Sequence, residues 1–454
     1  MARRCRMDAA EPLIRRALAI DEQSLGSEHS NVAIRLCSLA ALLQATNRLG
    51  EAEPLLRRAL AIDEQSYGHE HPHVARDLNN LALLLKATNR RAEAESLLRR
   101  ALVIDEHAYG PEHPDVAKSL NNLAQLLKAT NRLGEAEPLM RRALAIDEQS
   151  YGTEHPDVAR DLSNLAALLY ATNRLAEAEP LIRRALAIDE QAYGPEHPHV
   201  AIRLDILAQV LQATNRVVEA EPLIRRALAI DEQCYGLEHP HVAIHLSNLA
   251  LLLQVTNRVV EAEPLIRRAL AIDEQSYGTE HPDVARDLNN LAALLQATNR
   301  LGEAEPLMRR ALAIDEQSYG TEHPEVAIRL NTLAQLLQNT NRPKEAEPLM
   351  RRVLAIFRKS LGEDHPNVAT ALNNLARLLQ ATNRLAEAEP LMRSMLEILL
   401  QFTRVAGHPH PHLQSAIWNY SGLLSQMGRS EAEVSAQLKT LAHLYGLSSA
   451  IDPR

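Results

Sequence analysis

Apolar residues recur along this chain at spacings of three and four, interrupted at regular intervals by short polar stretches. Between Glu112 and Pro156, positions with this spacing share one face of a helix, which we call helix A. They are Val116, Leu120, Leu123, Ala124 and Leu127. After Thr130-Asn131-Arg132 a second apolar face predicts another helix, helix B, with Ala136, Leu139, Met140, Ala143, Leu144 and Ile146. The pattern therefore predicts two helices joined by a short turn.

Residue types typical of helix ends border both segments. Pro114 and Asp115 stand where helix A begins, since Pro loses no needed hydrogen bond there and Asp suits the positive end of the helix dipole. Asn131 tolerates the left-handed geometry that helix ends favour, and Gly152 predicts the end of helix B. Pro138 removes a backbone donor near the start of helix B, so we expect a loosened or slightly kinked first turn.

This pair of segments recurs about ten times. The tripeptide Thr-Asn-Arg returns with a step of 42 residues, starting at Thr46, Thr88, Thr130, Thr172, Thr214, Thr256, Thr298, Thr340 and Thr382. Self-similarity of this regularity is typical of a solenoid. One hairpin leaves its apolar face uncovered, so neighbouring repeats must stack, and the small residues Ala124 and Ala136 let the helices approach closely.

The ends of the chain depart from this regularity. Residues 1–26 hold a helix B without its helix A, a half repeat. Residues 27–400 make nine helix-pair repeats of the 42-residue period. Residues 401–454 are expected to form a linker over 401–411 and a degenerate repeat, whose helix A over 415–424 carries the single tryptophan, Trp418. Atypical terminal repeats usually act as caps.

Composition narrows the class of protein. A net charge of −9 argues against nucleic acid as the main partner. Cys5, Cys37 and Cys234 share no metal-ligand spacing, which predicts reduced thiols. No apolar run approaches the length of a membrane helix, and no signal core follows the basic N-terminus. We expect a cytoplasmic protein that binds neither nucleic acid nor membrane.

The apolar columns resemble the tetratricopeptide repeat signature. The resemblance rests on Leu120, Leu123, Ala124, Leu127, Ala136, Met140 and Ala143. The 42-residue period, the opening Gly-x-x-His-Pro-x-Val-Ala and the internal Leu-Asn-Asn-Leu-Ala are similar to the kinesin light chain subgroup. The resemblance covers about residues 8–445. It implies an all-α solenoid, a right-handed superhelix of antiparallel helix pairs in which helix A lines a concave groove that binds peptides or proteins.

Histidine is the most prominent candidate for chemistry. One column repeats with the period: His29, His71, His113, His155, His197, His239, His281, His323 and His365. Metal binding or acid–base catalysis is one interpretation; capping or packing at the start of helix A is the other, and we favour it. Metal ligands lie about 2 Å from the metal, whereas these positions are a whole hairpin apart. Without a single catalytic constellation, we predict neither an enzyme nor a cofactor.

A second stripe of helix A, beside the core stripe, carries the residues that vary between repeats, and the resemblance places it in the groove. Its candidate site residues are Arg76, Asn79, Asn80, Lys86, Lys118, Asn121, Asn122, Gln125, Lys128, Arg160, Asn164, Tyr170, Arg286, Asn289, Asn290, Asn373, Asn374 and Arg377. Asn and Gln can pair with the backbone of an extended peptide. The alternative is that these amides are solvated or brace the neighbouring hairpin.

The charge of this stripe suggests what it binds. Arg76, Lys86, Lys118, Lys128 and Arg160 make residues 76–170 basic, whereas Ile202, Ile244 and Ile328 make later repeats more apolar. We therefore predict an interaction scaffold for proteins or peptides, with an acidic or C-terminal segment held over residues 76–170. A self-assembling array that associates through the unpaired N-terminal helix is the alternative; RNA binding is disfavoured by the acidic balance and the few aromatic residues.

Overall fold

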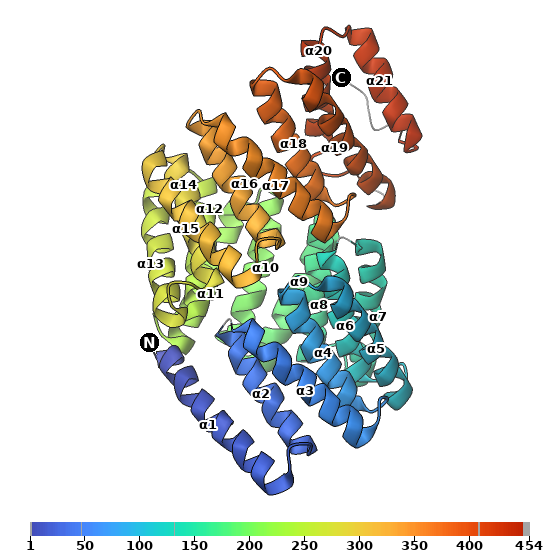
Figure 1. Ribbon diagram of the computed structural model, residues 1–454, viewed down its shortest axis with the longest axis vertical. Helices are drawn as coiled ribbons and strands as arrows, with labels where there is room; N and C mark the ends of the chain where they lie inside the picture. The colour runs from blue at the N-terminus through green and yellow to red at the C-terminus, as the bar shows by residue number, and fades with distance from the viewer. Residues whose placement is uncertain (1, 47, 131, 407–408, 448–454) are drawn as a thin grey trace. The chain divides into compact units, whose positions relative to one another are not determined.

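The computed structural model describes residues 2–46, 48–130, 132–406 and 409–447. In these ranges the chain forms 21 α-helices and no β-strand (Figure 1), which confirms the all-α class. Internal contacts divide the chain into two units, Met1–Thr298 (unit 1) and Asn299–Arg454 (unit 2), which we describe separately.

The even-numbered helices from α2 to α20 correspond to helix A. They are α2 (Ser30–Ala45), α4 (Pro72–Ala87), α6 (Pro114–Ala129), α8 (Pro156–Ala171), α10 (Pro198–Ala213), α12 (Pro240–Val255) and α14 (Pro282–Ala297) in unit 1, and α16 (Pro324–Asn339), α18 (Pro366–Ala381) and α20 (Leu413–Gln426) in unit 2.

The odd-numbered helices correspond to helix B. They are α1 (Ala2–Leu25), α3 (Leu49–Tyr67), α5 (Arg91–Tyr109), α7 (Leu133–Tyr151), α9 (Leu175–Tyr193), α11 (Val217–Tyr235) and α13 (Val259–Tyr277) in unit 1, and α15 (Leu301–Tyr319), α17 (Pro343–Leu361), α19 (Leu385–Ala406) and α21 (Glu431–Leu444) in unit 2. Helix α7 runs through Pro138 without a break, as its equivalents run through theirs.

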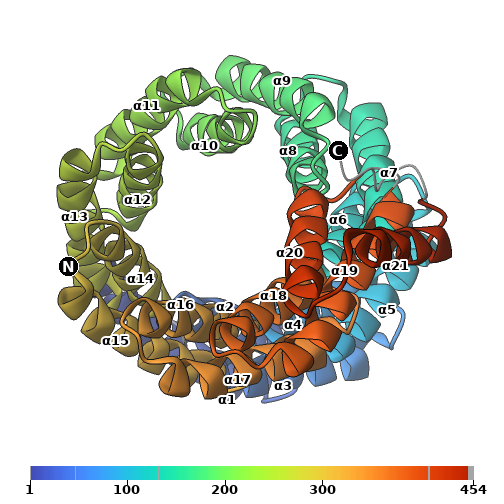
Figure 2. The same cartoon turned by 90° about the horizontal axis from the view of Figure 1, so that it is seen from above.

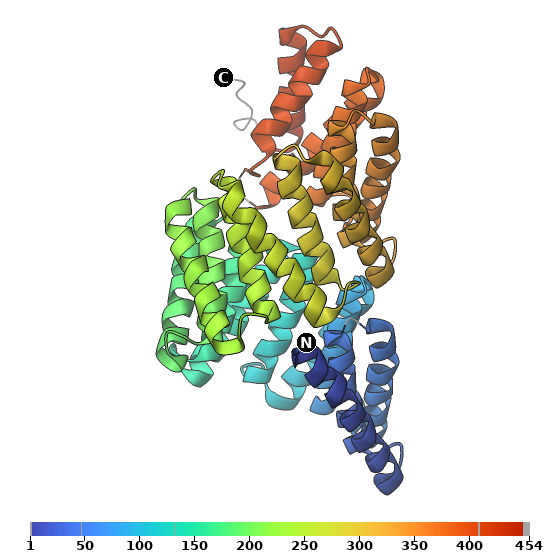
Figure 3. The same cartoon turned by 90° about the vertical axis from the view of Figure 1, so that its left-hand side faces the viewer.

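Within each unit, neighbouring helices pack in chain order, as Figure 3 shows for the green and yellow-green helices of residues 200–280. In unit 1 the successive pairs turn about a common axis in a right-handed sense, with helix A on the inner side and helix B on the outer side (Figure 2). The core columns are buried as the spacing predicts. Val116, Ala117 and Leu120 of α6 pack with Ala143 and Ile146 of α7.

The histidine column caps helix A. In each even-numbered helix from α2 to α18, the histidine is the N-cap and its Nδ1 accepts the backbone N–H two residues later, as His113 does from Asp115 at 3.2 Å. The preceding tyrosine stacks on the ring, with centroids of Tyr109 and His113 4.5 Å apart. The prediction that this column caps and packs at the helix start is confirmed.

Asparagine and glycine end the helices as predicted. Seven asparagines of the Thr-Asn-Arg turns have φ between 58° and 62°, among them Asn173; Asn131 itself lies outside the described residues. The next residue closes the turn, since Arg174 N–H donates to the carbonyl of Leu169 at 2.8 Å. Gly152 ends α7 with φ of 85°, a conformation that glycine adopts at no steric cost.

Arginines on the outer face join consecutive helices B. Arg174 of the Thr-Asn-Arg turn binds Glu137 of the preceding helix B at 2.8 Å and also binds Glu177 of its own helix. Glu137 also binds Arg141 of its own helix at 2.7 Å. The same arrangement recurs at Arg132 and Arg216. Because these exposed pairs form networks, they contribute more than isolated surface ion pairs do.

A buried polar seam joins helix B to the next helix A. Helix B carries a buried aspartate, and a helix-A residue, here called the seam position, faces it. Asp189 accepts a hydrogen bond from Arg203 at 2.8 Å, and Asp105 accepts one from Ser119 at 2.6 Å. The seam positions are Arg35, Asp77, Ser119, Asp161, Arg203, His245, Asp287, Arg329, Ala371 and Ala416. Where helix B has Phe357 instead of aspartate, the seam position is Ala371, so no buried charge needs a partner.

The chain after α18 differs from the expectation. Helix α19 continues to Ala406, so residues 401–406, expected in a linker, are helical. The physical reason is that Arg404 stands where earlier repeats have the terminating glycine, such as Gly362, and Leu399, Leu400 and Thr403 extend the buried face. Helix α20 follows from Leu413, and Ser430 starts α21 with a capping box.

We predict that Arg203→Met destabilises unit 1 by about 3–5 kcal/mol, because it leaves Asp189 buried beside no positive charge. The double variant Asp189→Phe/Arg203→Ala copies the Phe357/Ala371 pair of this chain and should recover most of the loss. Hydrogen exchange of α9 and α10 measures the local effect, which suits a repeat array that does not unfold in one step. Equal losses in both variants would contradict a charge-based seam.

His245 makes stability depend on pH. Its Nδ1 lies 3.0 Å from Asp205 and its Nε2 lies 3.0 Å from Asp231. Burial alone would lower its pKa, but the two carboxylates raise the pKa to about 9. Since this folded-state pKa exceeds the unfolded value of about 6.5, the contribution is complete below that value and is lost as pH rises through about 9.

The test compares wild type with His245→Gln between pH of about 7 and 9.5, by urea unfolding followed by circular dichroism. Wild type should lose its advantage over the variant as pH rises across this window, by an amount on the order of 1–3 kcal/mol. A difference between the two chains that stays constant would show that His245 is not charged in the fold.

Candidate binding surface on the inner face of helix A

The asparagines of the inner stripe hold one helix A to the next. Asn121, a buried residue of α6, donates to Asp161 of α8 at 2.8 Å. Asn79 donates to Ser119 at 3.0 Å and accepts from Asn122 at 3.0 Å. In unit 2, Asn374 donates to Asn331 at 2.9 Å. These contacts favour the bracing interpretation for the asparagines.

The remaining amides lie on the same stripe. Asn164 donates to Asn121 at 3.4 Å and accepts from the exposed Gln125 at 3.1 Å. Asn80, Asn289 and Asn290 are half-buried on α4 and α14. The structure thus brings neighbouring asparagines together in pairs, and sequence spacing alone did not reveal which pairs.

Three arginines of the stripe, one each on α4, α8 and α14, face the seam. Arg160 binds Asp147 of α7 at 2.9 Å and Asp161 of its own helix at 3.1 Å. Arg286 contacts Asp273 at 3.0 Å, and Arg76 contacts Asp63 at 3.0 Å, in the same way. Burial raises the pKa of Asp161, and the charge of Arg160 opposes the rise. These guanidinium groups therefore compensate buried carboxylates within the fold.

Two lysines lack such compensation. Lys86 of α4 and Lys128 of α6 occupy equivalent, half-buried positions, and among the described residues neither has a hydrogen-bond or ion-pair partner. Burial lowers the pKa of both, and the charges of Arg91 and Lys86 lower the pKa of Lys86 and Lys128, respectively, further. Tyr170 of α8 follows at the same position and is 40% exposed. We call Lys86, Lys128 and Tyr170 the basic row.

Lys118 belongs to a different hollow. A cavity of about 350 Å³ between α4 and α6 is lined by Arg76, Asn79, Asn80, Lys118 and Asn122. Asp105 and Asp115 also line it, and Lys118 binds Asp115 at 2.8 Å. Its positive and negative groups therefore balance one another.

Further along unit 1, Ile202 of α10 and Ile244 of α12 are exposed to 44% and 39%. They occupy the stripe position that Arg76, Lys118 and Arg160 hold in earlier repeats. As far as the described residues show, the inner face of unit 1 thus carries positive charge without a partner on α4 and α6, and exposed apolar residues on α10 and α12.

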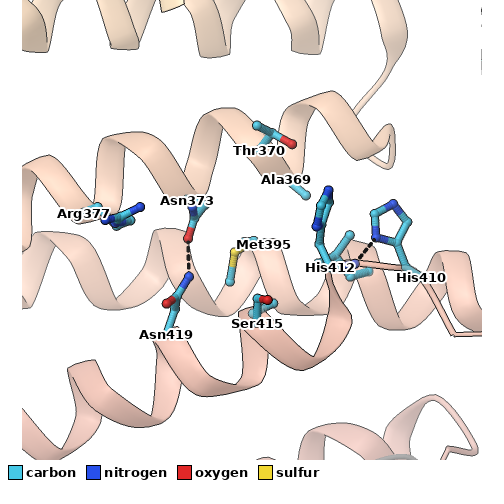
Figure 4. A pocket seen from close by; sticks show the side chains of 11 residues that line it. Ala369, Thr370, Asn373, Arg377, Met395, His410, His412, Ser415 and Asn419 are labelled. Carbon is cyan, nitrogen blue, oxygen red and sulfur yellow. Dashed lines mark hydrogen bonds between the residues drawn. The ribbon is translucent and has the colours of Figure 1, made fainter. Parts of the chain in front are cut away.

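A second cavity lies in unit 2 among α18, α19 and α20, with a volume of about 310 Å³. Figure 4 shows Asn373 and Arg377 of α18 facing Ser415 and Asn419 of α20, with Met395 of α19 between them. Asn419 donates to Asn373 at 3.0 Å across the gap. We call this cavity the α18–α20 pocket.

The seam position is the column that sequence reasoning missed. It belongs neither to the core columns nor to the stripe, and its residues change from acidic to basic to small between repeats. The sequence does carry a signal for this column. Where Phe357 or Leu399 replaces the aspartate of helix B, the seam position is alanine, as Ala371 and Ala416 show.

The described residues were also compared with what a metal site or a membrane-spanning helix requires. They contain no group of three or more His, Cys, Asp or Glu side chains placed to hold a metal ion. No helix in the described ranges has both the length and the apolar character needed to cross a bilayer.

Comparison with known proteins agrees with this architecture. The tetratricopeptide repeat family matches eight segments, residues 1–65, 38–107, 78–149, 132–191, 162–233, 241–317, 288–359 and 326–401. The chain therefore belongs to the tetratricopeptide repeat family, whose members are generally protein-interaction scaffolds. No curated protein matches it.

Similar solved structures include kinesin light chain-like proteins. A Podosopora anserina protein assigned as a kinesin light chain, with nearly identical TPR-like repeats, is 28% identical; the match covers 46% of this chain and 98% of that one, with a TM-score of 0.39. BtubC (BKLC) from P. vanneervenii is 25% identical over 52% of this chain and 92% of its own, with a TM-score of 0.41.

We predict that Asn121→Ala destabilises the contact between α6 and α8 by about 1–3 kcal/mol, because Asp161 loses a buried hydrogen bond. Hydrogen exchange of α8 should speed up, while Gln149→Ala on the outer face of α7 should change little. Unchanged hydrogen exchange of α8 in the Asn121 variant would show that Asn121 does not brace the two helices, and the asparagines would then remain candidates for binding a ligand.

Proposed function

We propose that the chain is a scaffold that binds extended segments of partner proteins along the inner face of unit 1. An acidic part of the segment lies on the basic row, and an apolar part lies further along, at Ile202 and Ile244. The observation that carries the proposal is the pair Lys86 and Lys128, half-buried and without an acidic partner among the described residues.

A partner carboxylate would relieve the cost of these lysines. Each lysine has already lost part of its hydration, and the two repel one another. A carboxylate between them supplies charge-assisted hydrogen bonds, which are stronger than neutral ones. Most other cations of this face are already paired inside the fold, as Arg76, Arg160 and Lys118 show.

The exposed apolar residues on α10 and α12 add a second requirement. A segment that follows the inner face from α4 to α12 meets positive charge first and apolar surface afterwards. Such a segment binds in extended form, since polar amides and half-buried side chains alternate along the helices it crosses. We propose no catalytic role and no cofactor, and self-association through α1 is the competing function.

The test uses a synthetic peptide library with constant apolar content and a graded number of glutamates. Binding to wild type should increase with glutamate number and weaken with added salt. Lys86→Glu/Lys128→Glu should abolish the preference for acidic peptides, a change of tenfold or more in Kd, or about 1.4 kcal/mol. The matched control is Lys344→Glu/Lys359→Glu, two exposed lysines of α17.

Equal peptide binding by wild type and by the Lys86/Lys128 variant would exclude the basic row as the site. Mass measured by light scattering over a range of protein concentrations tests the competing function. A mass that rises with concentration, together with no peptide preference, would favour the self-assembling array.

A further inference from the structure

The α18–α20 pocket exists because this seam has lost its polar contents. In the equivalent place, other repeats put a helix-B aspartate against a polar seam residue, as Asp315 does with Arg329. Here Leu399 and Ala416 hold these two positions. The preceding seam pairs Phe357 with Ala371, and the large ring of Phe357 fills the space between the helices. Leu399, which replaces the phenylalanine here, is smaller than that ring, and Ala416 is again an alanine.

A change in repeat length accompanies the loss. His365 and His410 begin equivalent segments but stand 45 residues apart, three more than the regular step. His410 still caps the chain locally, since its Nδ1 accepts the backbone N–H of His412 at 3.1 Å. His412 stands at the rim of the pocket, opposite the end formed by Arg377 (Figure 4).

The pocket has an apolar floor. Met395, Leu399 and Ala416 are each about 3% exposed, and Ala369 is 1% exposed. The walls are polar: Asn373 and Asn419 hydrogen-bond to each other, and Thr370 and Ser415 stand beside them (Figure 4). A ligand that fits both must combine an apolar body with polar ends.

The charged side chain that lines the pocket is positive. Arg377 and two histidines line the pocket, and no aspartate or glutamate is among its lining residues. Among the described residues Arg377 has no ion-pair or hydrogen-bond partner, in contrast to Arg351 and Arg393, which bind Glu347 and Glu397. The hollow between α4 and α6 differs, because carboxylates balance its cations. The lining therefore favours an anion.

We infer that the α18–α20 pocket binds a small organic carboxylate, with its apolar body on Met395 and Leu399 and its carboxylate on Arg377. A volume of about 310 Å³ equals that of roughly ten water molecules, which suits an acid of about ten non-hydrogen atoms. Arg377 presents a planar pair of donors that matches a carboxylate. The bound carboxylate has two potential sources, a free organic acid or the C-terminal residue of a peptide. This site lies in unit 2 and does not depend on the basic row.

The chain contains its own reporter. Trp418, the single tryptophan, lies on α20 next to Asn419 and is 78% exposed. Its fluorescence, together with titration calorimetry, follows binding to the full chain. The probes are hexanoate, octanoate and hydrocinnamate, with octanamide as the neutral analogue. The peptide probes are acetyl-alanyl-leucine with a free carboxyl group and the same dipeptide as its amide.

Wild type should bind at least one of the acids saturably and the amides at least tenfold more weakly. Arg377→Gln should weaken binding tenfold or more, and Arg377→Lys should restore part of it. Ser415→Phe, at an exposed rim position, should block the pocket without altering the core. Arg351→Gln on α17 is the matched control, and Lys86→Glu/Lys128→Glu should bind like wild type, which separates this proposal from the proposed function.

Tighter binding of the dipeptide acid than of the free acids would identify a chain terminus as the source, and the reverse order would identify a free organic acid. Circular dichroism confirms that the variants keep their helix content. No saturable binding of any carboxylate by wild type would overturn the inference, as would binding that survives both Arg377→Gln and Ser415→Phe.

Discussion

The rest of the structure depends on the seam between one hairpin and the next. A single hairpin cannot bury its own apolar face, so each helix B must pack against the following helix A. In most repeats this packing traps an aspartate that is fully or almost fully buried. A buried carboxylate is tolerated only with a close partner. The seam position provides that partner where it is arginine, serine or histidine; where it is itself aspartate, the neighbouring stripe arginine provides it, as Arg160 does for Asp147. Where the aspartate is absent, the seam position is alanine. The residue in helix B and the seam position facing it therefore depend on one another.

This constraint decides which inner-face residues remain for a ligand. The arginines and asparagines that sequence reasoning placed in a groove are largely engaged: Arg160 with Asp147 and Asp161, and Asn121 with Asp161 and Asn164. The basic row and Arg377 lie one or two helical turns further along the helix and carry charge that the described residues do not neutralise. A ligand site in this fold is therefore expected where the stripe changes between repeats and the seam does not use it.

Much of the fold was predictable because its signals are local. The 42-residue step, the apolar spacing and the residues at helix ends depend on neighbours a few positions apart, so they fixed the helices, the asparagine turns and the histidine caps. The partners of Asn121 or Arg203 lie on other helices, and their pairing depends on how far each hairpin is rotated against the next. Periodicity within one helix carries no information on that rotation. The extension of α19 could have been predicted, since Arg404 replaces the expected glycine.

Protonation affects the stability of the seams and of the cap at His281 in opposite directions. Burial raises the pKa of Asp161 and Asp273, with the neighbouring Asp287 adding to the rise at Asp273, so their folded states favour the protonated form. Their stabilising contribution is present at low pH and is lost as pH rises through the folded-state pKa values. The cap at His281 needs an unprotonated Nδ1, and burial lowers its pKa, although Asp283 opposes this. Its contribution is present above a pH of about 6.5 and is lost as pH falls below it. The cap at His281 therefore limits stability on the acid side, whereas the seams at Asp161 and Asp273 limit it on the basic side.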